Sequence, residues 1–181
     1  QKKSKCFVNL AYANFTKHIE EEEKCDYYKL MEFISKSEQE TRKLAQILGK
    51  EIVKNPLHKK RATVIGLEGE LGAGKTTFVK GFAKGLGVKE KVTSPTFILM
   101  KVYNFKGKIE GGPKFLFHFD CYRLKDHKDL ALLGAKEFMA DPRNIVLIEW
   151  SDRIEEILPT RYIKIHLDHI DKKTRKITVK K

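Results

Sequence analysis

One short segment has the residue types and the spacing needed to hold the phosphates of a nucleotide. The segment Gly69-Glu70-Leu71-Gly72-Ala73-Gly74-Lys75-Thr76 matches the pattern G-x-x-x-x-G-K-[ST]. Glycines let the backbone curl so that its N–H groups point at phosphate oxygens, and Lys75 would bridge the β- and γ-phosphates. The hydroxyl of Thr76 is a ligand that Mg²⁺ prefers, and Thr77 is a candidate to support it. The predicted phosphate-contacting residues are Gly69, Gly72, Ala73, Gly74, Lys75, Thr76 and Thr77.

The neighbouring sequence supplies the two elements that must position this loop. Residues 62–67 form a short apolar, β-branched run of the kind that makes a buried strand. Apolar residues then recur at helical spacing over residues 78–86, and Gly85 and Gly87 are helix stop signals. The alternative is a glycine turn that matches the pattern by chance, and such a turn would not need a strand before it and a helix after it. The order of strand, glycine loop and helix therefore favours a phosphate-binding loop.

Two acids follow strand-like apolar runs and are candidate catalytic residues. Asp120 follows residues 115–119, where strand alternation places His118 and Asp120 on one face. Glu149 follows the uninterrupted apolar run 145–148, which is typical of a central parallel strand. Ligands of open α/β sheets bind at the carboxyl ends of strands. We therefore expect one acid to hold Mg²⁺ or its water and the other to orient the attacking water, with the two roles left open.

Three further residues lie beside these acids. A strand histidine such as His118 is more often hydrogen-bonded or packed than a base, so we expect it to support the site. Trp150, the only tryptophan of the sequence, follows Glu149 and either covers the site or packs in the core. Arg123 could reach a phosphate or a partner, or form an exposed ion pair.

The remaining patterns predict an α/β sheet with helices on its faces. Ser37 and Glu40 have capping-box spacing and begin a helical pattern that Asn55-Pro56 ends. The carboxyl-terminal segments surround a polar turn, which indicates an antiparallel hairpin or two closing strands. We divide the chain into an amino-terminal extension, residues 1–30, and a domain, residues 31–181. Further strands are expected at 97–103, 162–167 and 176–179, and a further helix at 129–139.

Composition narrows the class of protein. The chain has 181 residues and 41% hydrophobic residues, enough for one globular domain. No apolar run approaches the roughly 20 residues of a membrane span, so no membrane partner is expected. The cysteines Cys6, Cys25 and Cys121 are odd in number and widely spaced, which favours a reducing, cytoplasmic location over a disulfide framework or zinc site. The net charge of +13 makes polyanionic partners plausible.

Four motifs in order carry a resemblance to a known family. Residues 69–77, Val92-Thr93-Ser94-Pro95-Thr96-Phe97, His118-Phe119-Asp120-Cys121-Tyr122-Arg123-Leu124 and Ile148-Glu149-Trp150-Ser151 together resemble the TsaE family. Its members are bacterial P-loop ATPases of tRNA threonylcarbamoyladenosine synthesis. The resemblance extends from about Phe33 to the closing strands. Cys121 occupies a position that is usually aliphatic, and a free cysteine behaves as a small hydrophobe.

The resemblance implies a compact P-loop α/β fold that binds ATP and Mg²⁺ and hydrolyses ATP slowly. It implies action on the threonylcarbamoyl transferase subunit and its paralogous partner, which modify the adenosine next to the anticodon, with tRNA contacted through that complex. Lys75 and Thr76 would contact phosphate and Mg²⁺, Asp120 would be the catalytically important acid, and Glu149 a metal-associated acid. Thr96 resembles a switch-type element near the γ-phosphate, and Trp150 a residue adjoining the nucleotide.

Other functions compete with this interpretation. A small-molecule or nucleotide kinase shares the P-loop, although no arginine-rich lid segment is recognisable. A GTPase is disfavoured because no [NT]-K-x-D motif occurs. A non-catalytic RNA-binding module could use residues 161–181, which contain eight Lys and Arg and two acids. A solvated basic tail explains the same residues.

Overall fold

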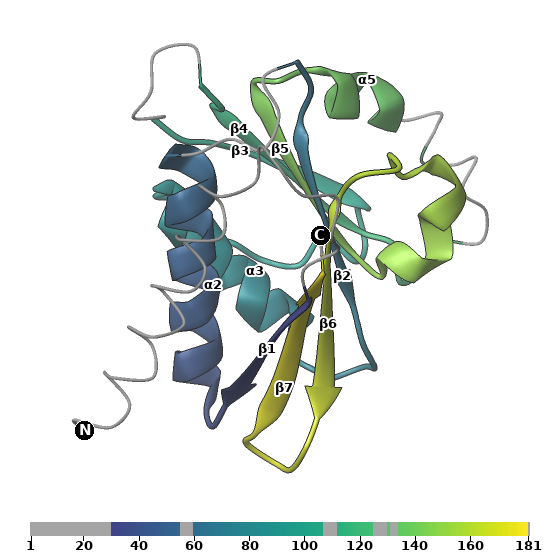
Figure 1. The fold of residues 1–181 in the computed structure, drawn as a ribbon. Helices are drawn as coiled ribbons and strands as arrows, with labels where there is room; N and C mark the ends of the chain where they lie inside the picture. The colour runs from purple at the N-terminus through teal and green to yellow at the C-terminus, as the bar shows by residue number, and fades with distance from the viewer. Residues whose placement is uncertain (1–29, 55–59, 107–111, 125–129, 131–133, 181) are drawn as a thin grey trace.

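The computed structural model describes residues 30–54, 60–106, 112–124, 130 and 134–180 (Figure 1). Within these residues, seven strands form one mixed sheet in the order β1-β7-β6-β2-β5-β4-β3. The strands are β1 (Leu30–Ser35), β2 (Thr63–Glu68), β3 (Met100–Asn104), β4 (Phe115–Asp120), β5 (Asn144–Glu149), β6 (Ile163–His169) and β7 (Arg175–Lys180).

The centre of the sheet is parallel and both of its edges are antiparallel. Strands β6, β2, β5 and β4 run in one direction, whereas β3 is antiparallel to β4, and β7 is antiparallel to both β6 and β1. Strands β2 and β5 are buried along their whole length, as expected of central parallel strands. The register pairs Glu149 with Leu67 on one side and with Asp120 on the other. The carboxyl ends of β2, β5 and β4 therefore meet at one edge of the sheet.

Helices cover both faces of the sheet (Figure 1). Helix α2 (Glu38–Lys54) and helix α3 (Lys75–Leu86) pack on one face, where Phe78 and Phe82 are buried with Leu147 of β5. The other face carries helix α5 (Ala135–Ala140) and the 3₁₀ helix η1 (Ser151–Ile157). The predicted α/β sheet with flanking helices and a carboxyl-terminal antiparallel hairpin is confirmed.

The predicted start of helix α2 is also observed. The Ser37 hydroxyl accepts a hydrogen bond from the Glu40 N–H (3.2 Å), and the Glu40 carboxylate accepts one from the Lys36 N–H (2.8 Å). These bonds satisfy amide groups that a helix start leaves without partners inside the helix. The predicted stop at Asn55-Pro56 lies outside the described residues.

One predicted strand begins later than the sequence suggested. The strand predicted at 97–103 begins at Met100, because the N–H groups of Ile98 and Leu99 both donate to the Pro95 carbonyl in a turn. Leu99 has a φ of 65°, which a strand residue does not adopt. Of the helix predicted at 129–139, the structure describes Leu130, which is helical, and α5 (Ala135–Ala140), which follows Gly134 with a φ of 78°. Residues 129 and 131–133 lie outside the described residues.

Two elements were not predicted at all. Strand β1 closes one edge of the sheet against β7, and helix η1 follows Trp150. Residues 1–29 lie outside the described residues, so the division of the chain at residue 30 stays a prediction. Among the helices of the described residues, none combines the length and the apolar character that crossing a membrane requires.

Candidate functional site

The glycine-rich loop between β2 and α3 has a backbone that requires glycine. Gly69, Gly72 and Gly74 have φ values of 124°, 80° and 102°, a region that other residues seldom enter. A Cβ atom on Gly69 would lie 2.2 Å from the Leu167 carbonyl oxygen of β6. Helix α3 begins directly after Gly74, and no side chain caps it there. The loop thus brings a helix amino terminus with its N–H groups to the carboxyl end of β2.

Lys75 is buried in this loop, with 5% of its surface exposed. Its ammonium group donates hydrogen bonds to the carbonyl oxygens of Gly69 (2.6 Å) and Glu70 (3.0 Å). It also lies 3.6 Å from the centre of the Trp150 ring, within cation–π distance. Burial lowers the pKa of Lys75, and the carboxylates of Glu149 and Asp152 oppose that effect. A buried cation is therefore held at the predicted phosphate site.

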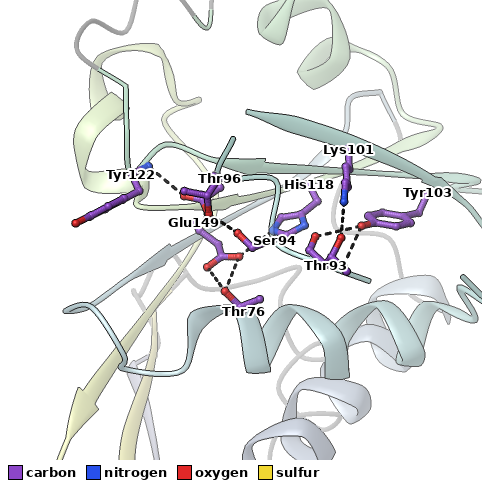
Figure 2. A network of polar contacts seen from close by, with 10 residues as sticks. Thr76, Thr93, Ser94, Thr96, Lys101, Tyr103, His118, Tyr122 and Glu149 are labelled. Atoms are coloured by element: carbon purple, nitrogen blue, oxygen red, sulfur yellow. Dashed lines mark hydrogen bonds and ion pairs between the residues drawn. The ribbon is translucent and has the colours of Figure 1, made fainter. Parts of the chain in front are cut away.

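Thr76 and Glu149 form the centre of a polar network (Figure 2). The Thr76 hydroxyl lies 2.9 Å from Oε2 and 3.2 Å from Oε1 of Glu149. On the other side, Nε2 of His118 lies 2.9 Å from Oε1 of Glu149. A carboxylate accepts hydrogen bonds, so Nε2 of His118 is the donor in this contact. The Nδ1 atom of His118 is buried and has no partner among the described residues.

Asp120 is held by the loop that follows residue 92. Its Oδ2 atom accepts a hydrogen bond from Ser94 Oγ (2.7 Å) and one from Thr96 Oγ1 (2.5 Å). Its Oδ1 atom accepts a bond from the Tyr122 N–H (3.1 Å). Lys101 and Tyr103 of β3 contact Thr93, so the edge strand fixes the start of the same loop (Figure 2). Asp120 thus connects β4 to the segment that contains Thr96.

Trp150 follows Glu149 with a left-handed backbone, φ 61° and ψ 46°. Such a conformation is costly for a bulky residue, and it is compensated here by a hydrogen bond from the Trp150 N–H to the Leu67 carbonyl (2.9 Å). The turn places the indole beneath Lys75, and Tyr122 packs on it with ring centres 5.0 Å apart. The indole therefore lies beside Lys75 and also packs against the core on that face of the sheet.

Of the other predicted residues, some lie at the site and some point away from it. Ala73 is buried in the loop, whereas the Thr77 hydroxyl points to helix α2 and lies 3.4 Å from Glu38. The Arg123 guanidinium lies 4.5 Å from the centre of the exposed Phe97 ring. The structure therefore brings together Lys75, Thr76, Glu149, Asp120, Thr96 and Trp150, but not the side chains of Thr77 and Arg123.

Sequence reasoning placed Ser94 in the switch-type segment with Thr96, but it assigned no roles to Thr93, Lys101 and Tyr103. The available signal for Ser94 was its place in the motif of residues 92–97, because a hydroxyl there can donate to the Asp120 carboxylate. The contacts of Lys101 and Tyr103 with Thr93 depend on the pairing of β3 with β4, which the sequence does not reveal.

The donor atoms of this site fit Mg²⁺ and a phosphate chain. Thr76 supplies a hydroxyl and Glu149 a carboxylate, both hard oxygen donors. Within the described residues, no three His, Cys, Asp or Glu side chains cluster to hold a metal ion. Mg²⁺ takes one or two protein ligands and completes its shell with phosphate and water, so a hydroxyl and a carboxylate are a sufficient donor set. Gly69 has no room for a side chain because its backbone packs against the Leu167 carbonyl of β6, which fixes the start of the loop.

Cys121, next to Asp120, is expected to be unreactive in the folded protein. Burial and then the Asp120 carboxylate raise the pKa of its thiol to about 12, from 9.0. Its thiolate fraction at pH 8 is then about 1,000-fold smaller than in the unfolded chain. In a Cys6→Ser, Cys25→Ser variant, iodoacetamide should modify Cys121 at least about 1,000-fold faster in 6 M guanidinium chloride than in buffer. Rapid alkylation without denaturant would contradict the described burial.

Comparison with known proteins identifies the family. Residues 35–177 match the family described as "Threonylcarbamoyl adenosine biosynthesis protein TsaE". The chain belongs to the TsaE family. A Haemophilus influenzae protein named tRNA threonylcarbamoyladenosine biosynthesis protein TsaE is 38% identical over 130 residues, covering 72% of this chain and 74% of that protein. A Treponema pallidum protein of the same name is 36% identical over 149 residues, covering 82% and 99%.

A solved TsaE-like structure has the same fold. The crystal structure of Bacillus subtilis YdiB matches with a TM-score of 0.65 and 32% sequence identity, over 86% of this chain and 88% of that one. The resemblance seen in the four sequence motifs is therefore confirmed at the level of family and fold.

Proposed function

We propose that this TsaE chain binds ATP with Mg²⁺ and hydrolyses ATP in support of threonylcarbamoyladenosine formation on tRNA. The single observation that carries the proposal is the group of Lys75, Thr76 and Glu149 at the end of the glycine-rich loop. Membership of the TsaE family supplies the process, since relatives are named for tRNA threonylcarbamoyladenosine biosynthesis. The transferase subunit, its paralogous partner and tRNA bound through their complex are the proposed partners.

The two acids take different roles in this proposal. Glu149 lies beside the Thr76 hydroxyl, so these two residues hold Mg²⁺ and its water ligands. His118 donates to Glu149 and fixes the direction of its carboxylate, a common arrangement behind metal ligands. Within the described residues, Asp120 forms no hydrogen bond with Thr76 and instead accepts hydrogen bonds from Ser94 and Thr96. Asp120 therefore orients the attacking water and connects its position to the Ser94–Thr96 segment.

The remaining residues bind and orient the phosphates. The N–H groups after Gly72 and the Lys75 ammonium stabilise negative charge on the transferred phosphoryl group. When bound, Mg²⁺ neutralises phosphate charge and helps to keep the reacting oxygens in line. Lys75 must give up its carbonyl contacts with Gly69 and Glu70 to reach a phosphate. Trp150 provides an aromatic face beside that movement.

Amide variants of the two acids separate their roles. Glu149→Gln keeps the shape of the side chain but removes the charge, so the Mg²⁺ concentration for half-maximal ATP hydrolysis should rise about tenfold. Asp120→Asn should lower kcat at saturating Mg²⁺ by about 100-fold, with the Mg²⁺ requirement unchanged within twofold. Both values come from Mg²⁺ titrations of phosphate release. Equal shifts in the Mg²⁺ requirement of both variants would contradict the assignment.

The function is tested by reconstitution. Purified transferase subunit, its paralogous partner, tRNA, ATP and the precursors of the threonylcarbamoyl group are mixed with and without this chain. Modified nucleoside is then measured by mass spectrometry after digestion of the tRNA. We expect repeated turnover of the transferase complex only when the chain is present. Modification that proceeds equally well without the chain would contradict the proposal.

Labelled ATP separates the ATPase from the alternative, a small-molecule or nucleotide kinase. Transfer of the γ-phosphate to water releases inorganic phosphate, whereas a kinase transfers it to a metabolite. We expect inorganic phosphate as the product, released faster with the partner proteins. The cations of the carboxyl-terminal strands offer no special support for a stand-alone RNA-binding module, because Lys164 and Lys176 already pair with Glu68 and Glu32.

A further inference from the structure

Arg175, at the start of β7, contacts the glycine-rich loop from the side of its carbonyl groups. Its Nε atom donates to the Ala73 carbonyl (3.1 Å), and its Nη2 atom donates a longer bond to the Gly72 carbonyl (3.4 Å). Its Nη1 atom donates to the carbonyls of Asp171 (2.9 Å) and Thr174 (3.0 Å) in the turn between β6 and β7. One guanidinium group therefore connects the hairpin turn to the loop.

The direction of these bonds affects the inner side of the loop. In a trans peptide the C=O and N–H groups point to opposite sides, and the described residues contain no cis peptide bond. When Arg175 holds the Ala73 carbonyl outward, the N–H of Gly74 points inward. The Gly74 amide directly precedes Lys75 and helix α3. Arg175 thus fixes the orientation of one of the N–H groups available to an anion.

The β6–β7 hairpin also forms the wall on which the loop rests. The Gly69 backbone lies against the Leu167 carbonyl, where a Cβ would be 2.2 Å away. Gly72 faces the His169 ring, and Gly74 faces the Leu167 side chain. In Figure 1 the turn between β6 and β7 lies at the same end of the sheet as the loop that enters α3. The hairpin otherwise supports the glycine-rich loop by packing alone, and Arg175 adds hydrogen bonds to that packing.

We propose that Arg175 is a positioning residue that holds the Gly72–Ala73 carbonyls outward so that the Gly74 amide is directed at a nucleotide phosphate. The proposal rests on the proposed ATP-binding function and goes beyond it, because it assigns the carboxyl-terminal hairpin to nucleotide affinity. Arg175 does not itself touch the nucleotide. Its guanidinium has a fixed fork of donors, which a lysine ammonium cannot reproduce.

The test compares Mg²⁺·ADP affinity among full-length variants by calorimetry. Arg175→Met keeps an apolar stem but no donor, and it should weaken ADP binding about tenfold. Arg175→Lys keeps the charge but not the fork, and it should weaken binding at least threefold. The matched control is Lys176→Met, the next cation of β7, whose partner is Glu32 of β1 rather than the loop. That control should bind ADP within twofold of the wild-type chain.

A second measurement distinguishes positioning from a general loss of stability. In ¹⁵N-labelled wild-type protein, ADP should shift the Gly74 amide proton strongly, and Arg175→Lys should reduce that shift while leaving the thermal midpoint near that of Lys176→Met. Arg175→Lys and Arg175→Met variants that both bind ADP as tightly as wild type would overturn the proposal and leave the ATP-binding function intact. Should Arg175→Met not fold, Arg175→Lys alone decides. A wild-type chain that binds no ADP would overturn both proposals.

Discussion

Replacement of Lys75 by alanine is expected to lower ATP hydrolysis by at least about 100-fold, the scale seen when a preorganised charge-stabilising donor is removed. Lys75 is a buried cation at the start of α3, close to Glu149 and Trp150. Phosphate release at saturating Mg²⁺, with and without the partner proteins, measures the effect. Threonylcarbamoyladenosine formation should fall in parallel.

The matched control is Lys80→Ala, which removes an exposed lysine from the same helix. It should hydrolyse ATP within twofold of the wild-type chain. A Lys75→Ala variant with the same turnover as Lys80→Ala would remove Lys75 from the mechanism and contradict the proposed ATPase function. Because both variants replace lysine by alanine in α3, a difference between them cannot come from the helix propensity of alanine.

The difference in stability between the wild-type chain and Lys75→Ala should change with pH in a defined direction. Burial lowers the pKa of Lys75 below its value of 10.5, so the unfolded chain binds that proton more tightly than the folded chain. The free energy of unfolding of the wild-type chain therefore rises, relative to Lys75→Ala, as pH increases from the folded pKa toward 10.5. Urea unfolding at pH 8 and pH 10 measures this difference. A fall in the relative stability of the wild type over that interval would contradict the burial of the ammonium group.

Local sequence patterns predicted the parts of the site that lie within one element. The glycine pattern placed the loop between a strand and a helix, and strand alternation placed His118 and Asp120 on one face. The structure adds that β4 and β5 are adjacent and in register, with Asp120 opposite Glu149. This pairing puts the His118 ring next to Glu149, a contact that neither strand predicts alone.

Contacts between distant segments could not be predicted from such patterns. Arg175 and Ala73 are separated by 102 positions, and Arg175 looked like one of several cations in a basic tail. The strand start at Met100 depends on a turn at Pro95, whereas apolar composition alone extended the predicted strand to residue 97. The left-handed backbone of Trp150 likewise follows from its bond to Leu67 in the neighbouring strand. In each case tertiary structure overrides local preference.

The glycines of α3 illustrate the same limit, because their sequence signal was ambiguous. Gly85 was interpreted as a helix stop, yet it lies inside α3, which ends at Leu86. A Cβ on Gly81 would lie 2.2 Å from the Arg42 carbonyl oxygen, and a Cβ on Gly85 would lie 2.3 Å from that of Gln46. Helices α2 and α3 thus approach along a seam at which the backbone of α2 fills the space of a side chain. This seam fixes the helix that begins with Lys75.

Substitution of Gly81 by alanine is therefore expected to destabilise the chain by about 3 kcal/mol, although alanine is the better helix former by about 1 kcal/mol. The Arg42 carbonyl belongs to the α2 backbone and cannot move aside as a flexible side chain could. For a domain of this size the thermal midpoint should fall by roughly 6–12 °C. Lys80→Ala, one position earlier and exposed, should leave the midpoint unchanged within about 2 °C. A Gly81→Ala variant as stable as Lys80→Ala would mean that α2 and α3 are farther apart than described. It would also contradict the position of α3 that places Lys75 beside Glu149.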